Sequence, residues 1–143
     1  NAYEIKDING DGRMDKLIPH GIIWMQGESD AEYSQESADA YLENLKNLMA
    51  LLRAALRNEN LPVVIGKIND SYMTPDGKPT QPFIEIVHSA QKEFTDSDGC
   101  ASYVTEIDSY KFSDDAWHYD TDGFIRMGIA FANAVALLES ECN

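Results

Sequence analysis

The sequence predicts an α/β fold in which helices cover a parallel sheet. Short apolar, β-branched segments alternate with longer segments whose apolar residues recur every three or four positions, so the predicted element order is β-α-β-α-β-α. Of the 143 residues, 43% are hydrophobic and 25% are charged, and the mean hydropathy is -0.39. This composition is typical of one globular domain and excludes a chain that is disordered throughout.

The three predicted strands are residues 20–25, 61–68 and 102–107, which are rich in Ile, Val and aromatic residues. Parallel neighbours require right-handed crossovers, and the segments between these strands can supply them. A doubly wound sheet usually has about five or six strands. We therefore expect three strands to be only part of one, with further strands on the N-terminal side. Residues 1–143 are then the C-terminal portion of a single larger domain.

Three segments have the periodicity of helices. The longest runs from Ala38 to about Asn58, the second covers residues 83–94, and the last begins near Thr121. Ser29 and Glu32 have the spacing of a capping box, which predicts that the Ser29 hydroxyl caps a helix.

The charge excludes several classes of partner. The net charge is -14, and such a field repels phosphate backbones and anionic lipid surfaces. No segment reaches the ~18 apolar residues that a membrane span requires. The first residues contain neither an initiator Met nor the regions of a signal peptide, so we expect an internal start. The sequence thus predicts no nucleic-acid partner and no membrane partner.

In an open parallel sheet, ligands bind outside the carboxyl ends of the strands. Residues 26–30, 69–71 and 108–120 follow the three predicted strands. The third of these loops contains Asp115 and His118, and a His held by an Asp is the base and orienting group of a nucleophilic triad. A solvated His in an acidic turn gives the same short pattern, so both interpretations stay open on these residues alone.

Residues 21–31, Gly-Ile-Ile-Trp-Met-Gln-Gly-Glu-Ser-Asp-Ala, resemble the Trp-x-Gln-Gly-Glu-Ser-(Asn/Asp) block of SGNH-superfamily carbohydrate esterases. The subgroup is that of sialate O-acetylesterases and acetylxylan-esterase-like proteins. The resemblance continues to Asp-x-x-His at 115–118 and Gly-x-x-Arg-x-Gly at 123–128, and it covers about residues 18–138. It implies a three-layer α/β/α, flavodoxin-like SGNH hydrolase fold, with the N-terminal strands outside this chain.

The resemblance also implies the roles of the site residues. His118 is the general base, Asp115 orients it, Glu28 competes with Asp115 for the acidic role, and Gln26 with Gly27 borders the oxyanion. The family's nucleophile is a Ser in a Gly-Gln-Ser-Asn-like block, which this sequence lacks, so we expect a Ser-containing N-terminal segment or a separate chain to supply it. The implied function is a carboxylic ester hydrolase that removes acetyl groups from carbohydrates without a catalytic cofactor.

Two alternatives remain at this point. Gly27-Glu28-Ser29-Asp30-Ala31 approximates the nucleophile elbow of an α/β-hydrolase, which would make Ser29 the nucleophile. Without a nucleophile, the chain could also be a non-catalytic carbohydrate-binding or assembly module. Among the other candidates, Asn69 and Asp70 are expected in the pocket wall, Trp117 is a candidate for the sugar site, and His20 and His88 are expected to be structural.

Residues 1–19 contain an acidic loop with calcium-ligand spacing, and residues 20–143 contain the strands and helices. Oxygen ligands fall at positions 1, 3, 5 and 9, with a backbone carbonyl at position 7. These ligands would come from Asp7, Asn9, Asp11, Arg13 and Asp15. Ile18 stands at position 12, where an EF-hand has Glu, so the loop is closer to the shorter calcium loops of extracellular proteins. We predict a structural Ca²⁺, and an ion-free turn is the alternative.

The two cysteines are far apart in sequence but close in the predicted topology. Cys100 precedes the third strand, which spans ~20 Å, and Cys142 follows a final helix of ~28 Å that runs back along it. We predict a Cys100–Cys142 disulfide, and two buried thiols are the alternative. A disulfide is typical of a secreted protein, so an extracellular or periplasmic location is expected.

Overall fold

The computed structural model describes residues 6–115 and 117–142, and its three strands form one parallel sheet in the order β1-β2-β3. The strands are β1 (Ile22–Trp24), β2 (Val63–Gly66) and β3 (Ala101–Val104). Ile23 pairs with Val64, which in turn pairs with Ser102. The strands are shorter than the predicted segments, although backbone hydrogen bonds such as that from the N–H of Lys67 to the carbonyl of Val104 at 3.0 Å continue beyond their ends.

The predicted helices are present, and the structure adds two short ones. The helices are α1 (Glu28–Tyr33), α2 (Gln35–Leu56), α3 (Ile84–Ser97), the 3₁₀ helix η1 (Glu106–Ser109) and α4 (Thr121–Glu141). The prediction that Ser29 caps a helix is wrong. Because the chain already turns at Gly27, α1 begins one residue before Ser29 and has no side-chain cap. Ser34 caps α2 instead, and its Oγ accepts the N–H of Ser37 at 3.1 Å.

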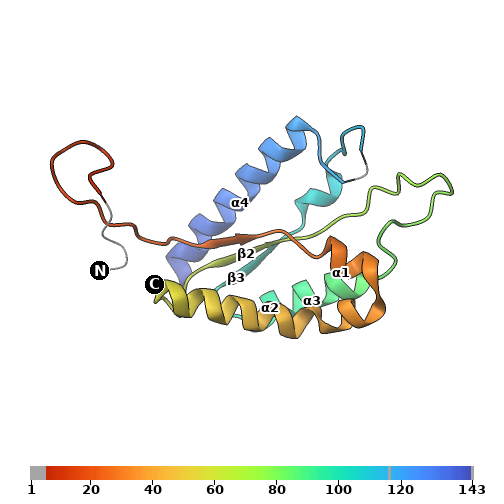
Figure 1. Ribbon diagram of the computed structural model, residues 1–143, viewed down its shortest axis with the longest axis horizontal. Coiled ribbons are helices and arrows are strands. Elements are labelled where there is room, and N and C mark those ends of the chain that lie inside the picture. Colours follow the sequence, from red (N-terminus) through yellow and green to blue (C-terminus); the bar gives the residue numbers. More distant parts are fainter. Residues whose placement is uncertain (1–5, 116, 143) are drawn as a thin grey trace.

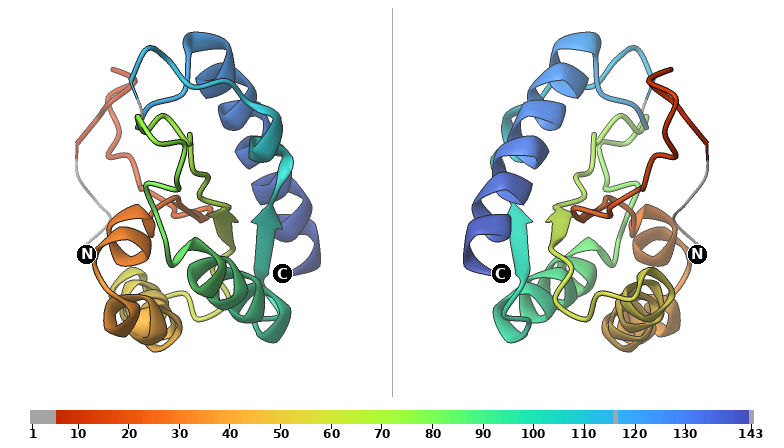
Figure 2. Two further views of the ribbon diagram at one scale, coloured as in Figure 1. Left: turned by 90° about the vertical axis from the view of Figure 1, so that its right-hand side faces the viewer. Right: turned by 90° about the vertical axis from the view of Figure 1, so that its left-hand side faces the viewer.

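The sheet lies between two helical layers, α1, α2 and α3 on one face and α4 on the other (Figures 1 and 2). Successive side chains of β2 point to opposite faces of the sheet. Val63 and Ile65 belong to the core beneath α2 and α3, and Val64 belongs to the core beneath α4. All three side chains are fully buried. The predicted three-layer α/β/α fold is thereby confirmed.

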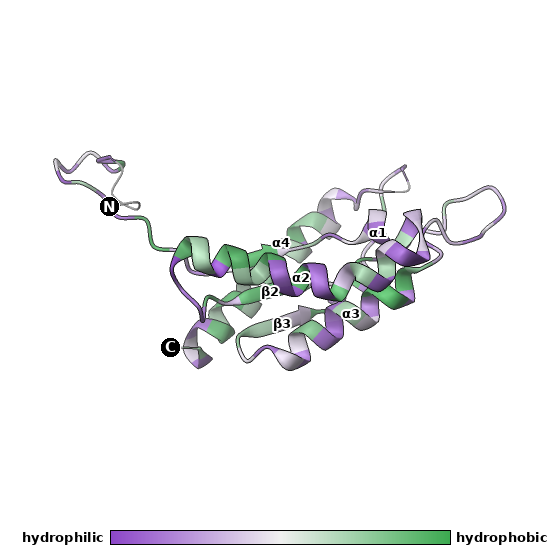
Figure 3. Ribbon diagram, turned by 60° about the horizontal axis from the view of Figure 1, so that its bottom comes forward, coloured by the Kyte–Doolittle hydropathy of each residue, from purple (hydrophilic) through white to green (hydrophobic). Residues whose placement is uncertain are grey.

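Helix α4 is long and apolar enough, by length and composition alone, to cross a membrane, the one such helix in the described part of the chain. Figure 3 shows apolar residues along much of it. One side of α4 is buried in the core between this helix and the sheet, through Met127, Phe131, Ala134 and Leu138. The packing against β2 and β3 accounts for this buried side, whereas Ile125, Ile129 and Leu137 on the same helix are more than half exposed.

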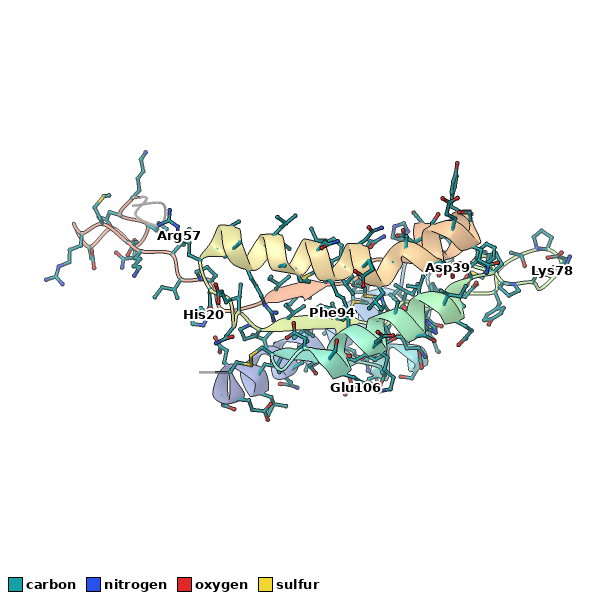
Figure 4. All side chains as sticks on the ribbon, turned by 90° about the horizontal axis from the view of Figure 1, so that it is seen from below. His20, Asp39, Arg57, Lys78, Phe94 and Glu106 are labelled. Atoms are coloured by element: carbon teal, nitrogen blue, oxygen red, sulfur yellow. A yellow bond between two sulfur atoms is a disulfide. The ribbon has the colours of Figure 1, made fainter. Side chains whose placement is uncertain are left out.

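The two ends of the sheet carry different features. The loops after β1, β2 and β3 lie at the carboxyl end, whereas the loop of residues 6–19 projects from the opposite end (Figures 1 and 3). At the amino end a disulfide joins Cys100 to Cys142, with the two Cα atoms 5.7 Å apart, and Figure 4 shows it as the yellow bond near the end of α4. The predicted disulfide is confirmed.

Candidate active site

Residues 111–115 and 117–120 belong to a hairpin at the carboxyl end of the sheet. Phe112 and Tyr119 form an antiparallel bridge, and the N–H of Asp120 donates to the carbonyl of Lys111 at 2.9 Å. The Tyr119 ring is buried and stacks on Phe112, with ring centroids 4.7 Å apart. Tyr119 therefore anchors the hairpin and fixes the position of the adjacent His118.

His118 and Asp115 are in direct contact within this hairpin. Nδ1 of His118 lies 3.0 Å from both Oδ1 and Oδ2 of Asp115. Oδ1 of Asp115 also accepts the backbone N–H groups of Trp117 and His118, each at 2.8 Å. The hydrogen bonds from the Trp117 N–H and from His118 lower the pKa of Asp115 to about 2. The carboxylate is therefore ionised at neutral pH and holds the imidazole ring through Nδ1.

The arrangement leaves the second nitrogen of His118 available. Nε2 makes no hydrogen bond within residues 6–115 and 117–142, and 69% of the side-chain surface is exposed. A ring held at Nδ1 by a carboxylate can take up a proton at Nε2, because the carboxylate stabilises the imidazolium that forms. The two side chains thus have the arrangement expected of a base and its orienting group, and both are exposed to solvent.

The loop after β1 holds the other predicted site residues. Gly27 is buried with φ 143°, and a Cβ at this position would lie 2.8 Å from Cγ1 of Val87, so only glycine fits. Nε2 of Gln26 donates to Oδ2 of Asp30 at 2.7 Å, and Glu28 is the first residue of α1. The turn at Gly27 therefore sends the chain directly from β1 into α1.

The structure brings some of these residues together and leaves others apart. Burial raises the pKa of Tyr119, and the negative charge of Glu28 raises it further, so Glu28 lies within electrostatic reach of the His118 hairpin. Of the two candidate acidic partners, only Asp115 contacts His118. Gln26 and Gly27 make no hydrogen bond to His118 in the part of the chain that the structure describes.

A family model described as carbohydrate esterase, sialic acid-specific acetylesterase matches residues 9–137. The chain belongs to this carbohydrate esterase family. The predicted family is therefore confirmed, and its description is that of a carbohydrate esterase. Esterases of this family generally need no cofactor.

The fold also matches a solved structure, an X-ray structure of a protein from Arabidopsis thaliana. The two are 23% identical with a TM-score of 0.65, over 82% of this chain and 44% of that one. This chain therefore spans less than half the length of its structural relative. The comparison with curated proteins finds no match.

Ser29, the alternative nucleophile, lies on the outer side of the esterase fold. It lines a surface hollow between α1 and α2 together with Asp30, Glu32, Tyr33 and Ser37. No hydrogen bond joins Ser29 to a histidine among the described residues. His20 pairs with Glu139 at the amino end of the sheet, and Nε2 of His88 lies 2.8 Å from the carbonyl oxygen of Ile68.

Asp70 closes the long loop that follows β2. Its carboxylate accepts the N–H of Tyr72 at 2.8 Å, the hydroxyl of Thr80 at 2.8 Å and the N–H of Gln81 at 2.7 Å. Burial raises the pKa of Asp70, but these hydrogen bonds outweigh it and leave the pKa below its usual value. In both views of the carboxyl end, this loop stands between α1 and the His118 hairpin (Figures 1 and 2).

In the loop predicted to bind calcium, the carboxylates accept backbone hydrogen bonds. Asp7 accepts the N–H groups of Gly10 at 2.6 Å, Asp11 at 3.0 Å and Gly12 at 2.7 Å, and Asp15 accepts that of Ile8 at 2.5 Å. No group of three or more His, Cys, Asp or Glu residues that could hold a metal ion is found in residues 6–115 and 117–142. Hydrogen bonds between these carboxylates and the loop's own backbone therefore hold its conformation.

Sequence reasoning missed a polar network beneath the loop after β1, in which two residues are buried and one is half-buried. Tyr41, Gln91 and Tyr103 come from α2, α3 and β3, and they hydrogen-bond to one another or to the carbonyl of Gln26. The one sign of this network in the sequence is Gln91, a polar residue beside the apolar positions Ala90 and Phe94 of α3. The identity of its partners depends on the tertiary structure, and no local pattern predicts it.

Proposed function

We propose that this chain supplies the general base and its orienting carboxylate to a carbohydrate O-acetylesterase. The observation that supports the proposal is the contact of His118 Nδ1 with both carboxylate oxygens of Asp115 at 3.0 Å. The pair is mounted on a hairpin at the carboxyl end of a parallel sheet, where ligands bind in such folds. In this proposal, Asp115 is the acidic member of the triad and Glu28 is a neighbouring carboxylate.

The proposed reaction uses Nε2 of His118 twice. First it takes the proton of a serine hydroxyl, and the serine oxygen attacks the acetyl carbonyl carbon. When the tetrahedral intermediate collapses, the sugar oxygen leaves and receives that proton from His118. Water, activated by the same nitrogen, then hydrolyses the acetyl-serine and releases acetate. The Gln26 side chain and the Gly27 N–H would stabilise the oxyanion of each tetrahedral intermediate.

The serine would come from an N-terminal segment of the same domain, paired along β1. In the described sheet β1 has a neighbour on one side only, and Ile23 on this strand is 52% exposed. An open edge with an apolar side chain is a surface that another strand can cover. The match covers 44% of the Arabidopsis chain, so more than half of that chain lies outside the match and is long enough to contain such a segment.

The test uses the complete protein that carries the N-terminal segment, with an aryl acetate, O-acetylated sialic acid and acetylated xylo-oligosaccharides as substrates. We expect hydrolysis that His118→Ala lowers by about 10³-fold or more. Ser29→Ala is the matched control and should retain activity. A folded Ser29→Ala variant without activity, beside a fully active His118→Ala variant, would contradict this assignment.

We also propose that Ca²⁺ binds the loop from Asp7 to Asp15, on the strength of its ligand spacing. The ligands would be side-chain oxygens of Asp7, Asn9, Asp11 and Asp15 and the carbonyl of Arg13. Calcium at ten times its dissociation constant should stabilise the fold by about 1.4 kcal/mol. Thermal unfolding with and without calcium measures this, and Asp11→Ala should remove the shift. An equal shift in both proteins would contradict the assignment.

An extracellular or periplasmic location is the third part of the proposal. The Cys100–Cys142 disulfide supports it, because such bonds persist in oxidising compartments. Thiol titration of the unfolded, unreduced protein isolated from its natural source should find no free thiol from this pair. Two free thiols would contradict the location.

A further inference from the structure

A buried polar network lies directly beneath the loop that carries Gln26 and Gly27. Gln91 is fully buried, and its Nε2 lies 3.2 Å from the carbonyl oxygen of Gln26 and 3.4 Å from the hydroxyl of Tyr41. Its Oε1 accepts the hydroxyl of Tyr103 at 3.2 Å. The network therefore connects α2, α3 and β3 to the end of β1.

Two donors of this network meet at one acceptor. The carbonyl of Gln26 accepts the Tyr41 hydroxyl at 2.6 Å and the Gln91 amide at 3.2 Å. Burial raises the pKa of Tyr41, so its hydroxyl keeps its proton and remains a donor. A carbonyl that is bonded by two buried side chains has a fixed direction, and it points into the layer formed by α2 and α3.

The direction of this carbonyl fixes the next N–H. A trans peptide is planar, so the N–H of Gly27 points away from the Gln26 carbonyl and thus away from Tyr41 and Gln91. Within the described residues this N–H donates no hydrogen bond. Gly27 itself is buried against Val87, which prevents the peptide from shifting as a whole.

The cost of the network indicates a role beyond packing. Buried polar groups are favourable only when they are fully paired, and apolar side chains would fill the same space with less risk. Here the side chains of Tyr41 and Gln91, both buried, hold one carbonyl at the end of a strand, and the half-buried Tyr103 bonds Gln91. Elsewhere beneath α2 and α3 the core consists mainly of apolar side chains, such as Leu45, Met49 and Phe94.

We propose that Tyr41 and Gln91 are positioning residues, which orient the Gln26–Gly27 peptide so that the Gly27 N–H and the Gln26 side chain face the oxyanion. This inference rests on the proposed esterase function. The two residues touch no substrate and act only through the peptide that they hold.

Two matched variants in the complete protein test this proposal. Tyr41→Phe removes the hydroxyl that bonds the Gln26 carbonyl, whereas Tyr103→Phe removes a hydroxyl that bonds only Gln91. Because a misdirected oxyanion donor affects the transition state more than the bound substrate, Tyr41→Phe should lower kcat by about tenfold and change KM by less than about twofold. Tyr103→Phe should lower kcat by less than about threefold.

A purely structural network would give a different result: both variants would lower the melting temperature, and both would change kcat equally or not at all. That outcome would overturn the proposal. Crystal structures of the two variants supply a readout that needs no activity, because the Gln26–Gly27 peptide should turn in Tyr41→Phe and keep its direction in Tyr103→Phe. If the unmodified complete protein has no esterase activity, the proposed function fails, and the peptide direction still decides whether Tyr41 positions it.

Discussion

The two ends of the sheet are held by different kinds of interaction. At the amino end, Cys100 is bonded to Cys142, and Arg53 forms a paired contact with Asp98 at 2.6 and 3.1 Å with side chains only 13% and 17% exposed. At the carboxyl end, His118 and Asp115 are joined inside a hairpin and are largely exposed. Figure 4 shows the two ends, with His20 at one and Lys78 at the other.

This difference separates stability from chemistry. The cross-links at the amino end join α2, α3, β3 and α4, so they resist unfolding of the whole chain. The loops at the carboxyl end are held by hydrogen bonds between carboxylates and nearby backbone N–H groups, and the proposed catalytic groups there stay exposed. We therefore expect variants at the amino end to change the free energy of unfolding and variants at the carboxyl end to change turnover.

The largest effect is expected at the carboxyl end. Asp115→Asn removes the charge that stabilises the imidazolium and should lower kcat of the complete protein by roughly 10³- to 10⁴-fold. The melting temperature should change little, because the amide oxygen of the variant can still accept the N–H groups of Trp117 and His118. Steady-state kinetics and thermal unfolding measure the two quantities.

Glu28→Gln is the matched control for Asp115→Asn, since it also replaces one acid by its amide. Glu28 does not contact His118, so its replacement should lower kcat by about tenfold at most. A greater loss in Glu28→Gln than in Asp115→Asn would show that Glu28 is the acidic partner.

The next largest effect belongs to the disulfide. A cross-link with a sequence separation of 42 residues stabilises by about 4 kcal/mol in the chain-entropy description. The double variant Cys100→Ser, Cys142→Ser should lose about this free energy of unfolding in denaturant titrations and keep its kcat at 25 °C. A reductant should destabilise the unmodified protein and leave the variant unaffected. A large fall in kcat of the folded variant would contradict the expectation that the amino end affects stability and not turnover.

The Arg53–Asp98 pair should follow. Arg53→Met leaves a mostly buried carboxylate without its partner and should cost about 3 kcal/mol of unfolding free energy. Lys92→Met is the control, because Lys92 pairs with Asp96 on the surface, and it should cost less than about 0.5 kcal/mol. If both variants lose the same free energy of unfolding in urea titrations, burial adds nothing to the stabilisation by the Arg53–Asp98 pair.

The smallest effect concerns pH. Partial burial raises the pKa of Asp98, but the hydrogen bonds from Arg53 and from the N–H of Cys100 outweigh it, so the pKa lies below its usual value. A lowered folded-state pKa stabilises the fold above the unfolded value near 4, and this contribution is lost as pH falls further. Asp98→Asn should therefore flatten the stability profile between pH 5 and pH 2. An unchanged slope there would show that other carboxylates control acid unfolding.

Much of the fold could be predicted from local patterns. The three strands follow from short apolar, β-branched runs, and α2, α3 and α4 follow from apolar residues that recur every three or four positions. The disulfide followed from topology, since a helix that returns along a strand brings its end to the strand's start. α1 was missed because it has only six residues. The chain also turns at Gly27, which has a positive φ, so the helix begins before Ser29, the residue that the capping pattern indicated.

The site could be predicted only in part. Asp115 and His118 are three residues apart, so one hairpin brings them together and the sequence alone indicates the pair. Tyr41 and Gln91 are 50 residues apart and meet Gln26 only because α2 and α3 pack side by side on β1 and β2. Local patterns carry no information on such contacts between distant segments.

The disulfide has one more consequence for the hairpin that carries His118. The bond between Cys100 and Cys142 encloses β3, the hairpin and α4 in a covalent ring. A protease that cuts this ring once, at the exposed hairpin, would leave two pieces still joined through sulfur. The nicked protein would migrate as one band in a non-reducing gel and as two bands after reduction, and α4 would stay tethered to the start of β3.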